Sequence, residues 1–307
     1  PGRGRLAWAY PNAGEAGYYR STLDAGLLSA ALARRSELSP VERAGLLNNL
    51  WARVRAGTLP VAAFLDGLAV FQGDSSRLVI EDAAAYLKTL RQELAAGDED
   101  RAALAAFAED FFGPHAKRLG WDKRKGENQE ATITRPTVLN ALALIAPKSV
   151  ADAEVTARLE AYIKDSSSLD AAVAPVVLTA AARRNDPGLL EAFRSLLASP
   201  RTPEQKNLML RALAEFNEPA LLDRYLGMTL TDDIRAQDAW MPYVWLLSNP
   251  ATRERAWSFV KANWKAGPKS LALFEEESGY LTPGLQTIAL ASKIALERAS
   301  GSVLVDA

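Results

Sequence analysis

The chain has no cysteine and only one histidine, His115, among its 307 residues. The lack of cysteine excludes disulfide bonds, thiolate metal sites and a cysteine nucleophile, but it leaves the compartment, cytoplasmic or exported, open. A zinc site of the His-Glu-x-x-His type needs two imidazoles one helical turn apart. A chain with a single histidine cannot provide that site.

An excess of charge of one sign and long apolar runs are also missing. Lysine and arginine number 36 against 37 aspartates and glutamates, so the net charge of -1 gives no long-range field for a polyanion such as nucleic acid. No apolar run approaches the roughly 18 residues that a membrane span needs, and residues 1–12 lack the apolar core of a signal peptide. We therefore expect a soluble protein with no nucleic-acid partner and no membrane span.

The motifs of several large enzyme classes are absent as well. The sequence has no Gly-x-Ser-x-Gly elbow, no P-loop and no paired-glycine dinucleotide fingerprint. His115 has no nucleophile motif or second ligand near it, and we interpret it as a partly exposed helix residue. We predict no catalytic residue, no metal ligand and no cofactor in this chain.

Prolines indicate where helices begin, because proline is well tolerated in the first helical turn. Ser39-Pro40 with Glu42 matches a capping box, and Gly57 suits the end of the same helix. Four further prolines recur at intervals of 16, 16 and 31 residues: Pro187, Pro203, Pro219 and Pro250. One helix and a turn take about 16 residues and a helical pair about 32, close to the periods of helical-repeat proteins.

Apolar residues follow the helical period in the same region. Leu189, Leu190, Phe193 and Leu197 share one helix face. We predict an all-α fold, a right-handed α-solenoid of HEAT- or armadillo-like helix pairs. Further helices are expected at 21–35, 61–71, 76–95, 100–118, 134–146, 150–164, 169–184, 232–248, 251–265 and 283–299.

The N-terminal segment departs from the helical pattern. Leu6, Trp8 and Tyr10 alternate with alanines, the turn region PNAGEAG follows, and residues 18–23 can return as a second strand. We predict a short β-hairpin in residues 1–24 and a helical-repeat domain in residues 25–307.

Aromatic and acidic groups in the second half have structural interpretations. Aromatic residues at helical spacing are more often core than a ligand-stacking surface, and we predict core for Trp240, Tyr243, Trp245, Trp257, Phe259 and Trp264. The acidic residues 98–100 and 232–233 are expected at helix N-termini, where they suit the helix dipole. Residues 275–277 are expected in a solvated turn or loop.

Arg235, Gln237 and Asp238 form the candidate peptide-binding site. They lie within about one turn of one another, and arginine and aspartate are seldom buried unless paired. One interpretation is a salt bridge or cap that joins two repeats. The other is that Arg235 or a nearby lysine faces the concave side of the solenoid and binds the carboxylate end of a peptide.

Four segments in this order resemble the C-terminal helical domain of the aminopeptidase N family, which includes the puromycin-sensitive and endoplasmic-reticulum aminopeptidases. They are GYYRSTLD (17–24), LSPVERAGLLNNLWARVRAGTL (38–59), RLGWD (118–122) and IRAQDAWMPYVWLLSNPATRERAWSFVKANW (234–264). In that family a Gly-x-Met-Glu-Asn motif and a zinc-binding His-Glu-x-x-His motif lie in a thermolysin-like domain upstream. Neither motif has a counterpart in this chain.

The resemblance implies a non-catalytic domain that covers the active-site chamber of a bacterial-looking zinc aminopeptidase and limits peptide access. Its partners would be the catalytic and β-sandwich domains of the same parent chain, together with the peptide substrate. The N-terminal hairpin would be a remnant of the β-sandwich, and zinc would belong to the parent catalytic domain. Two alternatives stay open: a free-standing helical-repeat scaffold that binds a protein or peptide on its concave face, and a stand-alone enzyme with an unfamiliar site.

Overall fold

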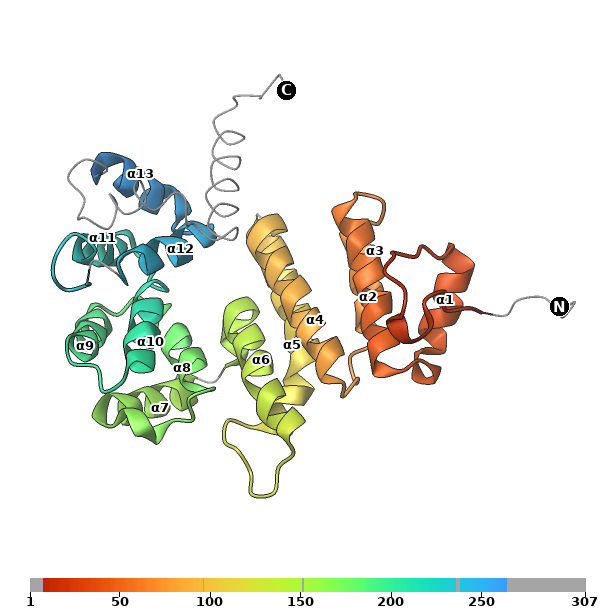
Figure 1. The fold of residues 1–307 in the computed structure, drawn as a ribbon, viewed down its shortest axis with the longest axis horizontal. Coiled ribbons are helices and arrows are strands. Elements are labelled where there is room, and N and C mark those ends of the chain that lie inside the picture. Colours follow the sequence, from red (N-terminus) through yellow and green to blue (C-terminus); the bar gives the residue numbers. More distant parts are fainter. Residues whose placement is uncertain (1–7, 96, 151, 236–237, 264–307) are drawn as a thin grey trace, which may run out of the picture. The chain divides into compact units, whose positions relative to one another are not determined.

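The computed structural model describes residues 8–95, 97–150, 152–235 and 238–263. Within these ranges the regular structure is helical, with thirteen α-helices and no strand (Figure 1). The all-α prediction is therefore confirmed for the described part of the chain. Contacts divide the chain into two compact units, Pro1–Asp152 and Ala153–Ala307, a division that the sequence alone does not reveal. The predicted boundary after residue 24 stays a prediction.

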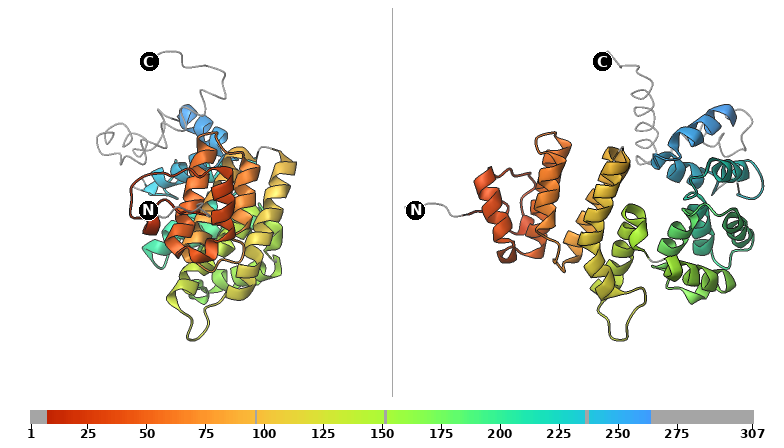
Figure 2. Two further views of the ribbon diagram at one scale, coloured as in Figure 1. Left: turned by 90° about the vertical axis from the view of Figure 1, so that its right-hand side faces the viewer. Right: turned by 180° about the vertical axis from the view of Figure 1, so that it is seen from behind.

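The first unit contains the longer helices. In it α2 packs against α3 and α4, and α6 packs against both α4 and α5 (Figures 1 and 2). Its core includes the fully buried side chains of Phe64, Ile80 and Phe112. The helices are α1 (Ala25–Ala33), α2 (Pro40–Arg55), α3 (Val61–Ala69), α4 (Arg77–Thr89), α5 (Asp98–Leu119) and α6 (Gln129–Ile145), with a π-helical turn at Leu90–Leu94 and 3-10 turns at Ala13–Glu15, Arg35–Glu37 and Pro147–Ser149.

The predicted capping box of α2 is present. The Glu42 carboxylate accepts a hydrogen bond from the Ser39 backbone N–H at 2.8 Å, and the Ser39 hydroxyl accepts one from the Glu42 N–H at 3.4 Å. Gly57, just beyond the helix end, has φ of 68°, a left-handed conformation that glycine adopts without a Cβ penalty. Both ends of α2 are thus set by local sequence.

Three successive helices of the second unit begin at prolines. Pro187, Pro203 and Pro219 each occupy the first position of a helix, as predicted. Pro250 instead lies in a turn before the last described helix, and in this turn the Asn249 carbonyl accepts from the Thr252 N–H at 3.1 Å. The helices are α7 (Asp152–Lys164), α8 (Ala174–Ala182), α9 (Pro187–Ala198), α10 (Pro203–Leu213), α11 (Pro219–Met228), α12 (Trp240–Ser248) and α13 (Arg253–Asn263), with a 3-10 turn at Ser166–Ser168.

Helices two apart in the chain are joined in this unit. α10 packs against α8, α9 and α12. Arg183 and Glu215 form an ion pair at 2.9 Å, and Arg255 pairs with Asp223 at 2.5 Å, each across 32 residues of sequence. The spacing of these contacts equals the helical-pair period expected from the prolines.

The described part of the N-terminal segment is not a hairpin. From residue 8 to residue 24 no strand is present, and the Asn12 side chain accepts from the Gly17 N–H at 2.8 Å and donates to the Gly17 carbonyl at 3.0 Å. The Tyr10 hydroxyl donates to Glu15. These side-chain bonds close a compact 3-10 turn and occupy the backbone groups of Gly17 that a strand ladder would use. Leu6 lies outside the described residues.

Several helix boundaries also differ from the expected ones. The acidic residues 98–100 begin α5 as predicted, but 232–233 lie in a turn and α12 begins only at Trp240. α6 begins five residues earlier than expected, because the Asn128 side chain caps it by accepting from the Ala131 N–H at 2.8 Å. The expected helix at 283–299 and the acidic residues 275–277 lie outside the described residues.

Candidate functional site

The three residues of the candidate peptide-binding site have different surroundings. Arg235 is exposed and lines a pocket of about 410 Å³ with Lys206 and Asp233. Asp238 forms an ion pair with Lys206 of α10, and both side chains are largely buried. Gln237 lies outside the described residues. Asp238 therefore forms a salt bridge, which was one of the two interpretations of this site. Peptide binding by Arg235 stays a prediction.

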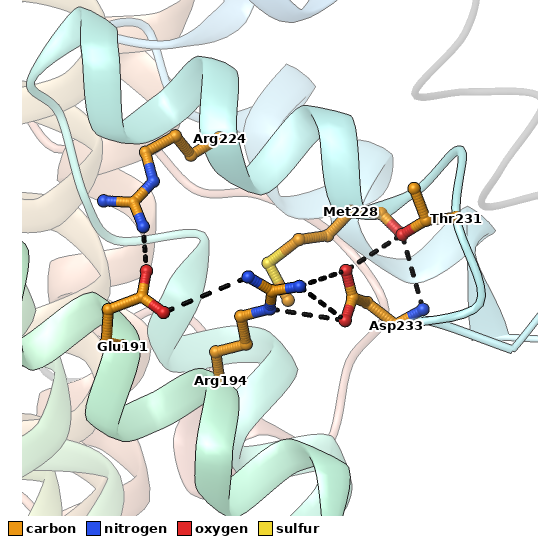
Figure 3. A network of polar contacts seen from close by, with 6 residues as sticks. All are labelled: Glu191, Arg194, Arg224, Met228, Thr231 and Asp233. Carbon is orange, nitrogen blue, oxygen red and sulfur yellow. Dashed lines mark hydrogen bonds and ion pairs between the residues drawn. The ribbon is translucent and has the colours of Figure 1, made fainter.

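A polar network lies beside this pocket (Figure 3). Arg194 of α9 donates to both carboxylate oxygens of Asp233, at 3.0 and 2.9 Å. The Thr231 hydroxyl donates to the same carboxylate at 2.9 Å, and Glu191 accepts from Arg224 of α11. The network explains why 232–233 do not begin a helix, since their turn is held to α9 by this ion pair.

The network is a surface feature. The side chains of its ion pairs are between 29% and 48% exposed. Exposed ion pairs contribute roughly 0–1 kcal/mol each, because water screens them and side-chain entropy opposes them. We therefore assign the network a structural role in joining α9, α11 and the turn before α12.

A larger pocket of about 560 Å³ lies within the second unit. Its walls come from the end of α7, the loop after it, the start of α8, one face of α10 and one aromatic side chain of α12. The lining residues include Tyr162, Leu169, Pro175, Arg201, Glu204, Gln205, Asn207, Leu208, Arg211 and Trp245.

One side of this pocket is fixed by buried hydrogen bonds. The buried Gln205 side chain accepts from the Arg201 backbone N–H at 2.6 Å. Gln205 also forms a side-chain hydrogen bond with Tyr162, and burial raises the pKa of this tyrosine. The arrangement ties α10 to α7.

The charges around the pocket are not equally available. Arg201 donates to Asp165 at 2.7 Å. The pKa of Asp165 is lowered to about 2, chiefly by the backbone N–H of Ser167 and then by the Ser167 hydroxyl and Arg201. Arg211 and Glu204 are exposed, and within the described residues neither has an ion pair or hydrogen-bonded partner.

The aromatic run is only partly core. Tyr243 is buried and shares a hydrogen bond of 2.6 Å with the Thr229 hydroxyl. Trp240 is 40% exposed, and Trp245 lines the large pocket, so the core interpretation was wrong for these two residues. Trp257 and Phe259 are half-buried, and Trp264 lies outside the described residues.

His115 is buried rather than partly exposed. It lies in α5, which continues through Pro114, and its ring packs 6.3 Å from that of Phe111. Its Nε2 has no hydrogen-bond partner among the described residues, and burial, followed by the charge of Arg118, lowers its pKa. The aromatic cluster of the α5 core explains the burial that spacing alone did not show.

Metal binding has no donor set among the residues that the structure describes. No group of three His, Cys, Asp or Glu side chains there is arranged to hold a metal ion. The single histidine is enclosed in α5 and has no carboxylate hydrogen bond. The zinc that the family resemblance implies would belong to the parent catalytic domain. In the same described ranges, no helix combines the length and apolar character that crossing a bilayer requires.

The large pocket could not be predicted from the sequence. Of its lining residues, Trp245 was expected in the core. A signal was present, because positions 204, 207, 208 and 211 fall on one helix face. The partners of that face come from other helices and cannot be read from local spacing.

Comparison with known proteins shows that the chain is similar to one region of several aminopeptidases. The family described as ERAP1-like C-terminal domain matches residues 8–294, and the chain belongs to this family. The predicted resemblance to the C-terminal domain of the aminopeptidase N family is thereby confirmed.

Several individual aminopeptidases match most of this chain. The chain is 25% identical over 267 residues to aminopeptidase M1-A of Oryza sativa subsp. japonica, covering 84% of this chain and 30% of the relative. It is 24% identical over 255 residues to aminopeptidase N of Lactococcus lactis subsp. lactis, covering 82% and 29%. Aminopeptidase 2, mitochondrial, of Saccharomyces cerevisiae is 22% identical over 237 residues, covering 76% and 25%. The matched region is under one third of each relative. Because plant, yeast and bacterial proteins all match, the bacterial origin stays a prediction.

Proposed function

We propose that this chain is the non-catalytic C-terminal domain of a zinc aminopeptidase, and that it covers the active-site chamber and limits the peptides admitted to it. The observation that carries the proposal is the family match over residues 8–294, in a sequence with a single histidine. The parent enzyme would remove N-terminal residues from peptides, with zinc in its own catalytic domain. The partners of this chain would be the catalytic and β-sandwich domains of the parent and the peptide substrate.

The described contacts support a solenoid as the form of this domain. Ion pairs across 32 residues join helices two apart in the second unit, as expected when helix pairs stack with a fixed repeat. We propose that these pairs form a right-handed α-solenoid whose concave side faces the chamber. In this arrangement Arg235 binds the peptide carboxylate. The nearby Asp238 does not neutralise Arg235, because the Asp238 carboxylate is already paired with Lys206.

The test compares the parent enzyme with and without this domain. Peptides of two to twelve residues would be assayed for kcat/KM, with and without a zinc chelator. We expect activity to reside in the catalytic part, to be lost with the chelator, and to lose its dependence on peptide length when this domain is absent. Peptidase activity of this chain alone that survives the chelator would overturn the proposal. A natural protein without an upstream zinc domain would favour the free-standing scaffold.

A variant of Arg235 tests the residue-level part. In the parent enzyme, Arg235→Gln is expected to raise KM for peptides with a free C-terminal carboxylate and to leave KM for the matching C-terminal amides unchanged. Arg55→Gln is the matched control, since Arg55 is also exposed and has no ion pair in the described residues. Equal effects on acid and amide peptides would remove Arg235 from peptide recognition.

A further inference from the structure

We propose that the 560 Å³ pocket of the second unit binds a short zwitterionic peptide, best a tripeptide with an apolar middle residue, between Glu204 and Arg211. The proposal concerns binding by this chain alone and does not depend on the function proposed above. It rests on the charge pattern of α10, on the availability of these two charges and on the shape of the pocket between them.

The charge pattern follows from helix geometry. Glu204 lies in the first turn of α10 and Arg211 in the last turn, and Asn207 and Leu208 lie between them on the same face. At 1.5 Å per residue, seven residues separate the two charged positions by about 10 Å along the helix axis. The pocket therefore has a carboxylate at one end and a guanidinium at the other.

Both charges are available to a ligand. Neither Glu204 nor Arg211 has an ion pair or hydrogen bond within the described residues. The other cation of the pocket, Arg201, is already paired with Asp165 at 2.7 Å, so Arg211 is the cation of the pocket without a partner among the described residues. A ligand that satisfies both free groups must carry a cation and an anion.

The space between the charges is apolar. Leu208, Leu169, Pro175 and Trp245 line it, and none of these side chains is fully buried. The volume falls within the few hundred to about 1,000 Å³ typical of small-ligand sites. Leu208 lines the pocket, where it can contact an apolar ligand side chain.

A tripeptide matches these dimensions. Three residues of extended chain span at most about 10 Å, which is close to the separation of the two charged positions. Its ammonium group would meet the Glu204 carboxylate, and its carboxylate would meet the planar donors of Arg211, which can bind it bidentately. The Asn207 amide, halfway along, has a donor and an acceptor for the peptide backbone.

Calorimetric titration of this chain with the tripeptide Ala-Leu-Ala tests the proposal. We expect saturable binding that weakens about tenfold when the ligand is N-acetylated and about tenfold when it is C-terminally amidated, with loss of both charges reducing it further. Absence of saturable binding in the millimolar range would overturn the proposal, as would equal binding of the doubly blocked peptide. In either case Glu204 and Arg211 would serve only the helix dipole.

Two variants test which end of the peptide each charged residue binds. Glu204→Gln should remove the preference for the free ammonium and keep the preference for the free carboxylate, and Arg211→Gln should do the reverse. Glu109→Gln and Arg55→Gln, at exposed positions without partners in the described residues, should leave binding unchanged. Each variant is at a solvent-exposed site, so circular dichroism is expected to show unchanged helix content. If both variants weaken all ligands equally, the proposed orientation is wrong.

Discussion

The two compact units use different polar contacts. In the first unit, Arg43 and Asp74 pair with side chains only 16% and 10% exposed, and Arg135 is buried against the Leu119 carbonyl and Glu127. In the second unit, Lys206 and Asp238 are buried to a similar degree, at 16% and 14% exposed, but the surface pair of Arg224 and Glu191 is about half exposed, at 47% and 48%. Burial raises the cost of removing one partner, whereas water replaces a lost exposed partner. The buried pair of Arg43 and Asp74 should therefore matter more than the exposed pair of Arg224 and Glu191.

The units also differ in their titratable groups. Asp82, whose pKa is raised to about 6, and His115, whose pKa is lowered from its ordinary value, both lie in the first unit. In the described part of the second unit, the lowered aspartate pKa values are those of exposed surface pairs, and the raised ones are those of buried tyrosines. The pH response near neutrality should come from the first unit.

The largest expected effect is from Arg43→Met. Its Nη2 lies 3.1 Å from Asp74 Oδ1, and its Nη1 donates to the Leu38 carbonyl at 2.8 Å. Removing it leaves a largely buried carboxylate without its cation, which should lower the free energy of unfolding by about 3 kcal/mol. Urea unfolding measures the change. Arg224→Met in the second unit should cost less than about 1 kcal/mol. Equal losses in the two variants would contradict the comparison.

Tyr225→Phe should have an effect of about 1 kcal/mol, the usual contribution of one buried neutral hydrogen bond. The fully buried Tyr225 hydroxyl donates to the Leu210 carbonyl at 2.6 Å and joins α11 to α10. A loss of this size would show that a polar group of the second unit also contributes to stability when it is fully buried. Thermal unfolding would measure the loss, with the exposed Tyr18→Phe as control. A silent Tyr225→Phe would mean that exposure does not explain the difference between the units.

Asp82→Asn should stabilise the first unit above neutral pH. Burial raises the Asp82 pKa to about 6, against a hydrogen bond from Asn48 that lowers it. The Asp82 pKa in the folded state thus lies above its pKa in the unfolded state, which is near 3.8. The stability that Asp82 contributes is therefore complete below pH 3.8 and is lost as the pH rises through about 6. The group is partly exposed, so we discount the effect to on the order of 1 kcal/mol.

Urea midpoints at pH 5 and pH 8 check this prediction. The wild-type chain should lose stability between these two values, and Asp82→Asn should lose less. The exposed Asp66→Asn is the control. A variant that follows the wild-type curve at both pH values would show that Asp82 does not cause the loss.

His115→Leu should have the smallest effect, and in the opposite pH direction. The His115 pKa is lowered by burial, so its contribution is complete above the ordinary value of 6.5 and is lost as the pH falls below it. Since the unpartnered Nε2 makes no hydrogen bond, leucine should cost little at pH 7.5. Unfolding curves from pH 7.5 to 5 should show a shallower decline for the variant. Parallel declines would exclude the only histidine as the cause.

Local features of the fold could be predicted where neighbouring residues decide them. Ser39 and Glu42 lie three positions apart and cap α2 whatever the rest of the chain does. The prolines at 187, 203 and 219 start helices for the same reason. The start of α12 could not be predicted, because the acidic pair at 232–233 is held by Arg194, 39 residues away from Asp233 in the sequence.

The candidate site shows the same limit. Arg235 and Asp238 were found as a pair of polar residues close in sequence, but the partner of Asp238 is Lys206, 32 residues away. Leu208 fits the apolar pattern of a core helix, yet it lines the pocket opposite residues from α7, α8 and α12. The sequence pattern of a helix predicts which of its residues lie on the same face. It does not predict which residues of other helices pack against that face.

The sequence by itself determined the helical class, the ends of several helices and the family, because helix capping, helical periodicity and family segments depend on residues near one another in the chain. Only the tertiary structure decided the division into two units, the burial of His115 and the gathering of Tyr162, Glu204, Arg211 and Trp245 around one pocket. The physical reason is that these features depend on packing between helices distant in sequence, where side-chain volume and unpaired charge select the neighbours.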